Sequence, residues 1–135
     1  MSCNGIIQRK LALLDQHRQR LEQYLAGVTL ADFAQDWSKR WMAERALQLM
    51  VEIVIDVAER IVALQNAGPC ATAVELIDTL VRLGVLKSAE PYRDMVRFRN
   101  LIVHRYETID PAVVFDICTQ HLQDFVRFRD EIDAA

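Results

Sequence analysis

The sequence predicts an all-α fold: an up-and-down bundle of about five helices, formed by a single domain over residues 1–135. Three observations support this prediction. Apolar residues recur at intervals of three and four along most of the chain, which is the period of a helix with one buried side. Only four Gly and three Pro occur, too few for the many turns of an all-β fold. A chain of 135 residues without an internal repeat or a linker holds one hydrophobic core.

The first two helices are predicted from apolar spacing. The first spans residues 4–26 and is ended by Gly27. Thr29 and Asp32 resemble a weak capping box for a short turn. The second and longest helix spans residues 38–65, and its buried side is expected to consist of Trp41, Leu47, Met50, Val51, Val54, Val57, Ala58, Ile61 and Val62. Ile53 and Ile55 add apolar surface outside that side, so this helix is either central in the bundle or in contact with a second subunit.

Capping residues mark the later helices. Thr72 and Glu75 form a capping box that opens a third helix, which Gly84 closes. Ser88 is expected to cap a fourth helix with Pro91 in its first turn. The apolar residues of the fourth helix expected to face inward are Met95, Phe98 and Ile102.

Asp110 followed by Pro111 predicts the start of a fifth helix, because proline is favoured at the first helical position. The expected buried stripe of this helix consists of Val114, Ile117, Cys118, Leu122, Phe125 and Ile132. His121 falls near that stripe and is expected at the edge of the core.

Composition narrows the class of protein. The net charge of −3 argues against a protein that coats nucleic acid indiscriminately, although 13 Arg against 3 Lys favours bidentate phosphate contacts. The three cysteines, Cys3, Cys70 and Cys118, lack a Cys-x-x-Cys spacing, so neither a disulfide framework nor a zinc site is expected. No cofactor is implied. With neither a signal peptide nor an apolar run long enough to span a membrane, the expected location is the cytoplasm.

The residues that carry chemistry are expected at the end of the fourth helix, over residues 99–106. Asn100 and His104 are four apart and share a face, whereas Arg99 and His104 are separated by about 140° around an ideal helix. Histidine titrates near neutrality, so it suits the removal or delivery of a proton during RNA cleavage. A guanidinium stabilises the charge that builds on phosphoryl oxygens. Asn100 suits orienting His104 or binding phosphate, and this set requires no metal.

The roles of three other arginines have two interpretations each. Arg93 and Arg97 lie one helical turn apart and either extend a phosphate-binding stripe for RNA or pair with Asp94 and Glu90 on a solvated face. Arg105 either contacts RNA or is simply solvated.

The role of an acidic stripe on the second helix also has two interpretations. Glu52, Asp56 and Glu59 either form a solvated face or supply one carboxylate that holds Arg99 or His104.

Two tryptophans, Trp37 and Trp41, lie four apart near the start of the second helix. Packing in the core or at an interface is favoured for this pair over a platform that stacks RNA bases.

Residues 99–106 resemble the Arg-Asn-x-x-x-His-x-Tyr signature of HepT-like toxins in the HEPN superfamily, and match it at every defined position. The superfamily at large shows only Arg, four to six residues, then His. The resemblance extends over essentially the whole chain, through residues 44–58 of the long helix, residues 83–86, Phe98 directly before the motif, and residues 106–110 after it.

The resemblance implies a specific function. HepT-like proteins are endoribonuclease toxins of type II toxin–antitoxin pairs, and their partner is a minimal nucleotidyltransferase antitoxin called MNT. They form homodimers in which motif helices from both subunits line a common cleft. By this resemblance Arg99 and His104 are the catalytic residues and Asn100 supports them. Tyr106 is the residue that the antitoxin adenylylates with ATP.

Two other classes of function stay open at this point. Some HEPN proteins accompany a nucleotidyltransferase as non-catalytic binding modules, and a helical dimerisation or scaffold protein would use the apolar faces alone. Neither function needs the complete set of Arg99, Asn100, His104 and Tyr106. The intact motif therefore favours the ribonuclease.

Overall fold

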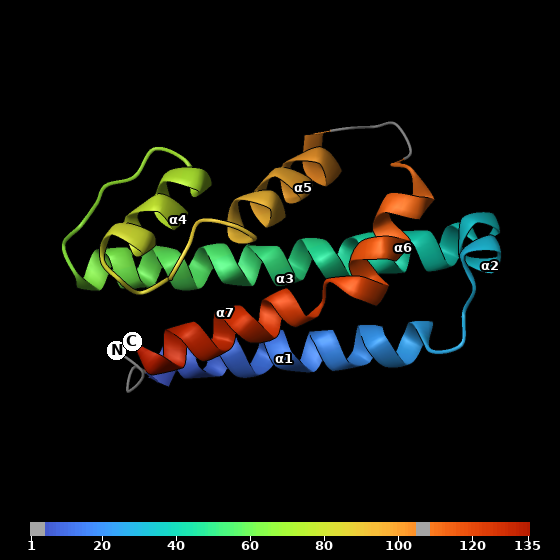
Figure 1. Ribbon diagram of the computed structural model, residues 1–135, viewed down its shortest axis with the longest axis horizontal. Helices are drawn as coiled ribbons and strands as arrows, with labels where there is room; N and C mark the ends of the chain where they lie inside the picture. The colour runs from blue at the N-terminus through green and yellow to red at the C-terminus, as the bar shows by residue number, and fades with distance from the viewer. Residues whose placement is uncertain (1–4, 105–108) are drawn as a thin grey trace.

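A computed structural model describes residues 5–104 and 109–135, with the side chain of His104 excluded. Over these residues the chain forms seven α-helices and no strand (Figure 1). The helices are α1 (Gly5–Leu25), α2 (Leu30–Gln35), α3 (Trp37–Leu64), α4 (Ala73–Arg82), α5 (Tyr92–His104), α6 (Pro111–Gln120) and α7 (Gln123–Ala134). The all-α prediction is confirmed, and the expected number of about five helices is wrong.

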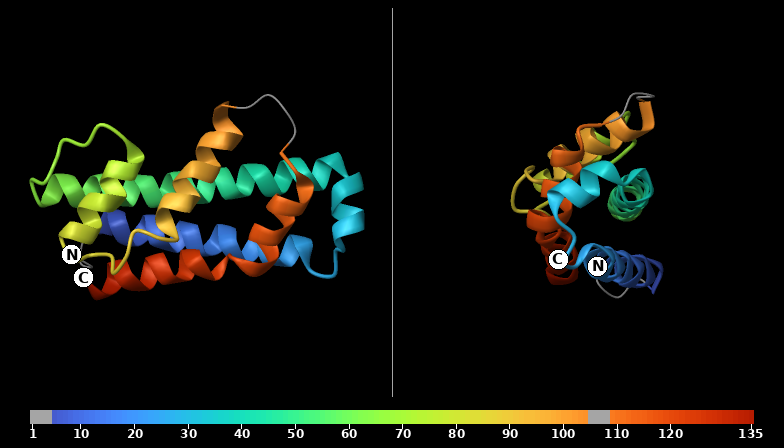
Figure 2. Two further views of the ribbon diagram at one scale, coloured as in Figure 1. Left: turned by 45° about the horizontal axis from the view of Figure 1, so that its top comes forward. Right: turned by 90° about the vertical axis from the view of Figure 1, so that its right-hand side faces the viewer.

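The long helix α3 lies at the centre of the bundle. It contacts α1, α2, α4, α5 and α6, and α7 lies along α1 (Figures 1 and 2). The shorter helices α4 and α5 lie on the side of α3 away from α1, whereas α6 crosses α3 and also contacts α1 and α2. This arrangement accounts for the apolar surface of α3 beyond one face: the helix is central.

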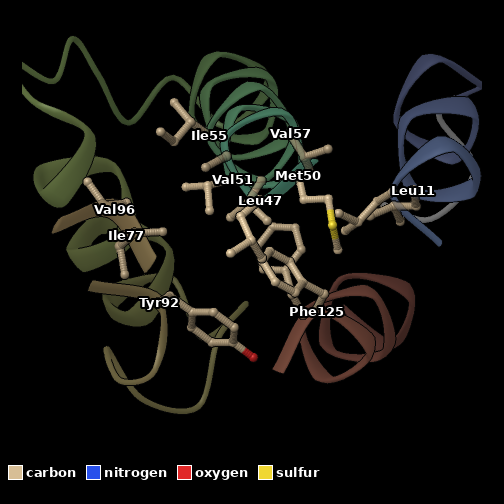
Figure 3. Close-up of a cluster of buried hydrophobic side chains, with 14 of the residues drawn as sticks. Leu11, Leu47, Met50, Val51, Ile55, Val57, Ile77, Tyr92, Val96 and Phe125 are labelled. Atoms are coloured by element: carbon tan, nitrogen blue, oxygen red, sulfur yellow. The ribbon is translucent and has the colours of Figure 1, made fainter. Parts of the chain in front are cut away.

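Buried side chains pack against α3 on two sides. Figure 3 shows Met50 of α3 directed toward Leu11 of α1, and Val51 directed toward Ile77 of α4 and Val96 of α5. All five of these side chains are buried. Packing on two sides fixes α3 as the support against which α5 is placed.

The buried side of α3 is predicted correctly except at Trp41. Trp41 is 68% exposed and Trp37 is 62% exposed, and their rings contact each other edge to face with centroids 5.4 Å apart. The prediction that this pair packs in the core is therefore wrong. Both side chains lie in the first two turns of α3 on a face that the bundle leaves open, whereas Ala43 in the second turn is fully buried.

Most of the predicted helix starts are confirmed by side-chain caps. Thr29 accepts a hydrogen bond from the backbone N–H of Asp32 over 3.2 Å, so it caps the short helix α2. Thr72 accepts one from the N–H of Glu75 over 3.2 Å at the start of α4. Asp110 accepts one from the N–H of Ala112 over 2.9 Å at α6. Each cap satisfies an amide that the helix leaves without a partner.

The predicted cap of the fourth helix is wrong. Ser88 lies before α5, and its hydroxyl donates to the backbone carbonyl of Glu90 over 2.7 Å. Glu90 supplies the cap instead, because its carboxylate accepts from the N–H of Asp94 over 3.2 Å. Pro91 precedes the helix, which begins at Tyr92.

The predicted fifth helix is two helices. Its apolar stripe continues at helical spacing through Cys118, Leu122 and Phe125, which are all buried, but the helix ends at Gln120 and a new one begins at Gln123. None of the described helices combines the length and the apolar character that crossing a membrane requires.

Candidate functional site

Helix α5 carries the motif, and its first two turns hold it in the bundle. Tyr92 and Val96 are fully buried against the core, and Phe98 is half-buried. Arg99 follows on the same side of α5 as Tyr92 and Val96, because steps of three and four residues return to one face. The α5 packing thus determines where Arg99 points.

Arg99 is half-buried, and its Nε atom is enclosed by the protein. That nitrogen has no hydrogen-bond partner among the residues that the structure describes. A buried N–H without an acceptor costs about 1–3 kcal/mol. Native structures keep few such groups.

Arg99 borders two neighbouring hollows on the surface. The α3–α4 hollow, of about 600 Å³, lies between the end of α3 and the start of α4, over residues 66–73. The α1–α3 hollow, of about 520 Å³, includes His17 and Glu52. Ile55 and Glu59 of α3 line both hollows with Arg99. A strand of nucleic acid laid over Arg99 therefore has space on either side of the guanidinium.

His17 of α1 also belongs to this region. It is half-buried and lines the α1–α3 hollow with Arg99. The two residues are far apart in sequence, and only the packing of α1 and α5 on α3 brings them to one hollow. No local pattern signals that relationship.

The acidic stripe of α3 lines the α1–α3 hollow. Asp56 forms an ion pair with Lys10 over 2.7 Å, and Glu52 accepts a hydrogen bond from Gln48 over 3.1 Å. Among the described residues no ion pair joins Arg99 to a carboxylate of this stripe. No contact among the described residues supports the hypothesis that one of these carboxylates holds Arg99.

The arginines in the first turns of α5 are bound to carboxylates. Arg93 pairs with Asp78 of α4 over 2.5 Å. Arg97 lies 3.0 Å from Asp94 and 3.4 Å from Glu90, which is the pairing that the sequence offered as the alternative to RNA binding. Exposed ion pairs of this kind contribute about 0–1 kcal/mol each, so they do not prevent exchange for a phosphate.

The motif residues after Arg99 project from the bundle. Asn100 is exposed, Leu101 is 41% exposed and Val103 is 42% exposed, whereas Ile102 is half-buried. Of the three apolar residues inside the motif, Ile102 is the one that packs partly against the bundle, so Leu101 and Val103 do not anchor the motif in the core. In Figure 1 the last turn of α5 points away from α3.

His104 is the last residue of α5. Its side chain, Arg105 and Tyr106 lie outside the described residues. The approach of His104 to Arg99 and the role of Tyr106 therefore stay predictions. In the described part of the chain no group of three or more His, Cys, Asp or Glu is arranged to hold a metal ion.

Comparisons with known proteins agree with this arrangement. The chain is 26% identical over 131 residues to a tRNA nuclease HepT of Aphanizomenon flos-aquae, covering 96% of this chain and 88% of the relative. It is 27% identical over 133 residues to an mRNA nuclease HepT of Shewanella oneidensis, covering 97% and 98%.

A solved structure extends the likeness to the fold. This structure contains a tri-AMPylated HEPN toxin of Shewanella oneidensis in complex with an MNT antitoxin. Its superposition gives a TM-score of 0.90 at 27% identity, over 98% of this chain and 99% of the other. The family model described as Ribonuclease HepT-like matches residues 14–132. The chain therefore belongs to the HepT-like ribonuclease family.

Proposed function

We propose that this protein is the toxin of a type II toxin–antitoxin pair: an endoribonuclease that needs no metal and is neutralised by an MNT-type nucleotidyltransferase antitoxin. The observation that carries the proposal is the placement of Arg99. Its enclosed Nε lacks a partner among the described residues, and its guanidinium lies between two open hollows. Membership of the HepT-like family supports the same activity.

The reaction needs two proton transfers and one site of charge stabilisation. The 2′-hydroxyl of the RNA loses a proton and attacks the adjacent phosphorus. The bond to the 5′ oxygen breaks, and that oxygen takes up a proton. His104 is suited to these transfers because imidazole titrates near neutral pH. Arg99 stabilises the charge on the phosphoryl oxygens, and Asn100 supports His104 or the phosphate.

A homodimer would complete the cleft. One α5 presents a single Arg99 at the edge of shallow hollows, and Val103 exposes apolar surface one turn further along. A two-fold axis near α5 would bring two motif helices together, bury that surface and double the local positive charge. Arg93, Arg97 and Arg105 would then extend the RNA contacts along α5, after exchange of the carboxylates that hold the first two.

The antitoxin acts on Tyr106 in this proposal. The phenolic oxygen attacks the α-phosphorus of ATP, pyrophosphate leaves, and the phenolic proton is lost. The AMP group places a phosphate near Arg99 and His104, where it competes with RNA for the guanidinium. Because RNA and ATP are the substrates of the two partners, we place the pair in the cytoplasm.

The test of the proposed activity is cleavage of defined RNA by the purified chain in the presence of EDTA. Cleavage products, with growth arrest when the chain is expressed without its antitoxin, are the expected result. A folded chain that binds RNA or the antitoxin and leaves RNA intact would identify it as a non-catalytic binding module.

A further inference from the structure

A cavity separate from the two hollows beside Arg99 lies on a different side of α5. It has a volume of about 520 Å³ and lies between α5, α6 and α7, over α3. We call it the α5–α6 cavity. Its apolar floor includes Leu47, Val51, Met95, Phe98, Ile117 and Phe125. Sites for small organic molecules are typically about 300–1,000 Å³ and are lined mostly by apolar and aromatic side chains.

The rim of the α5–α6 cavity is acidic. Asp94, Asp116 and Asp124 line it together with His121, and no Lys or Arg appears among the described residues that line it. Asp94 is already paired with Arg97 over 3.0 Å. The ion pairs of Asp116 and Asp124 within the described part of the chain are with the imidazole of His121, at 3.2 and 3.8 Å. The side chain of Asp116 is 62% exposed and that of Asp124 is 32% exposed, so both remain open to a ligand.

We propose that the α5–α6 cavity binds a small amphiphilic cation. An aromatic or branched apolar body would occupy the floor formed by Met95, Phe98 and Phe125. Its ammonium group would lie beside Asp116 and Asp124 at the rim. Burial of the apolar body stabilises the complex by roughly 25 cal/mol per Å². The carboxylates add attraction for a positive charge and repel an anion.

The same charges separate this cavity from the proposed ribonuclease site. An RNA phosphate would meet carboxylates here, whereas it meets the guanidinium of Arg99 on the other side of α5. Phe98 and Arg99 are adjacent in sequence but point about 100° apart around the helix. A ligand in the cavity therefore contacts the motif helix without covering Arg99. The proposal rests on the cavity alone and does not depend on the ribonuclease activity.

Three probes of one shape and different charge test the proposal. The ¹⁵N-labelled protein is titrated at low salt with 2-phenylethylamine (a cation), 2-phenylethanol (neutral) and phenylacetate (an anion). We expect the amine to shift the backbone amide signals of Met95, Phe98 and Ile117 in a saturable way and to raise the Tm. The alcohol should bind roughly five- to tenfold more weakly, since exposed ion pairs contribute up to about 1 kcal/mol each. The anion should be weaker still, and salt should weaken only the amine.

Substitutions test whether Asp116 and Asp124 cause the cavity to prefer a cation. Asp116→Asn combined with Asp124→Asn should remove the preference for the amine over the alcohol. Asp130→Asn is the control, because Asp130 is as exposed as Asp116, lies outside the cavity lining and pairs with Arg129. The melting temperature checks that each variant is folded. Equal affinity for amine and alcohol in the unaltered protein, shifts confined to other helices, or no saturable shift would overturn the proposal.

Discussion

Tyr92, the first residue of α5, donates a hydrogen bond from its phenol to the carboxylate of Glu131 on α7. The same carboxylate accepts from the backbone N–H of Lys87 over 2.8 Å and lies 3.4 Å from Arg127. The Tyr92 ring also packs edge to face on Phe128, with centroids 5.5 Å apart. Glu131 therefore ties α7 to the connection before α5 and to the helix that carries Arg99.

Removing the Tyr92 hydroxyl is expected to destabilise the fold. In Tyr92→Phe the carboxylate of Glu131 loses a donor in a nearly buried position, which costs about 1–3 kcal/mol. Urea unfolding measures this cost. Tyr24→Phe is the matched control because Tyr24 is partly exposed. Equal unfolding midpoints for the two variants would contradict the stabilising role of the Tyr92 contact.

The pH dependence of stability follows from the same contact. Burial, and then the hydrogen bond to Glu131, raise the pKa of Tyr92 far above its ordinary value of 10.0. The folded state thus holds this proton more tightly than the unfolded state. The stabilisation is complete below pH 10 and is lost as the pH rises further. Tyr92→Phe should lack this part of the alkaline decline. An identical decline in both proteins would assign it to other groups.

Arg99 should contribute to turnover through the fork geometry of its guanidinium. Arg99→Ala is expected to lower kcat/KM about 10²- to 10³-fold, in line with the loss of one group that stabilises transition-state charge. Arg99→Lys should recover only part of this, since an ammonium does not bind two phosphoryl oxygens in the same way. Arg20→Lys, on an exposed face of α1, is the control for charge-conserving exchange. Near-normal kcat in Arg99→Lys would reduce Arg99 to a general electrostatic anchor.

The exposed end of α5 offers a paired test of the homodimer. Helical geometry places Val103 about 40° from Arg99 and places Leu101 about 160° away, on the other side. The two side chains are equally exposed, at 42% and 41%. Val103→Asp should convert the dimer into a monomer in sedimentation experiments, because it puts a charge beside the proposed cleft. Leu101→Asp should stay dimeric. A stable monomer for the unaltered protein would contradict the composite cleft.

Adenylylation is expected at Tyr106. Incubation of the chain with its MNT-type partner, ATP and magnesium should add mass in steps of one AMP, and peptide mapping should place the adduct on Tyr106. Tyr106→Phe should fold and remain unmodified. An adduct on the Phe variant would mean that another residue is the acceptor, and no adduct on the unaltered chain would mean that the antitoxin acts by contact alone.

The sequence predicts helices well where a local signal exists. The caps at Thr72 and Asp110 are short-range patterns, and both are confirmed. The break between α6 and α7 lacks such a signal: neither Gly nor Pro marks it, and the apolar spacing from Val114 to Phe125 continues across it. Burial of Leu122 in the core stabilises that bend. Trp41 is mispredicted because its spacing fits the buried side, while nothing local shows which face at the start of α3 is left uncovered.

The site depends on sequence and structure in different ways. The motif predicts Arg99 and His104 as the catalytic residues without coordinates, because all its members lie within one short stretch of sequence. Their catalytic role stays a prediction. The two hollows around Arg99 require the packing of α1, α4 and α5 on α3, so no sequence pattern reveals them. The α5–α6 cavity is likewise assembled from four helices.

The measurement that bears most directly on the proposed function is RNA cleavage by His104→Ala in EDTA, read together with thermal melting. We expect the variant to melt like the unaltered protein, since His104 is the last residue of α5. Its cleavage of RNA and its toxicity in cells should be lost. His121→Asn, at the rim of the α5–α6 cavity, should cleave normally. A folded His104→Ala protein that cleaves RNA at the full rate would contradict catalysis by the Arg99 and His104 pair.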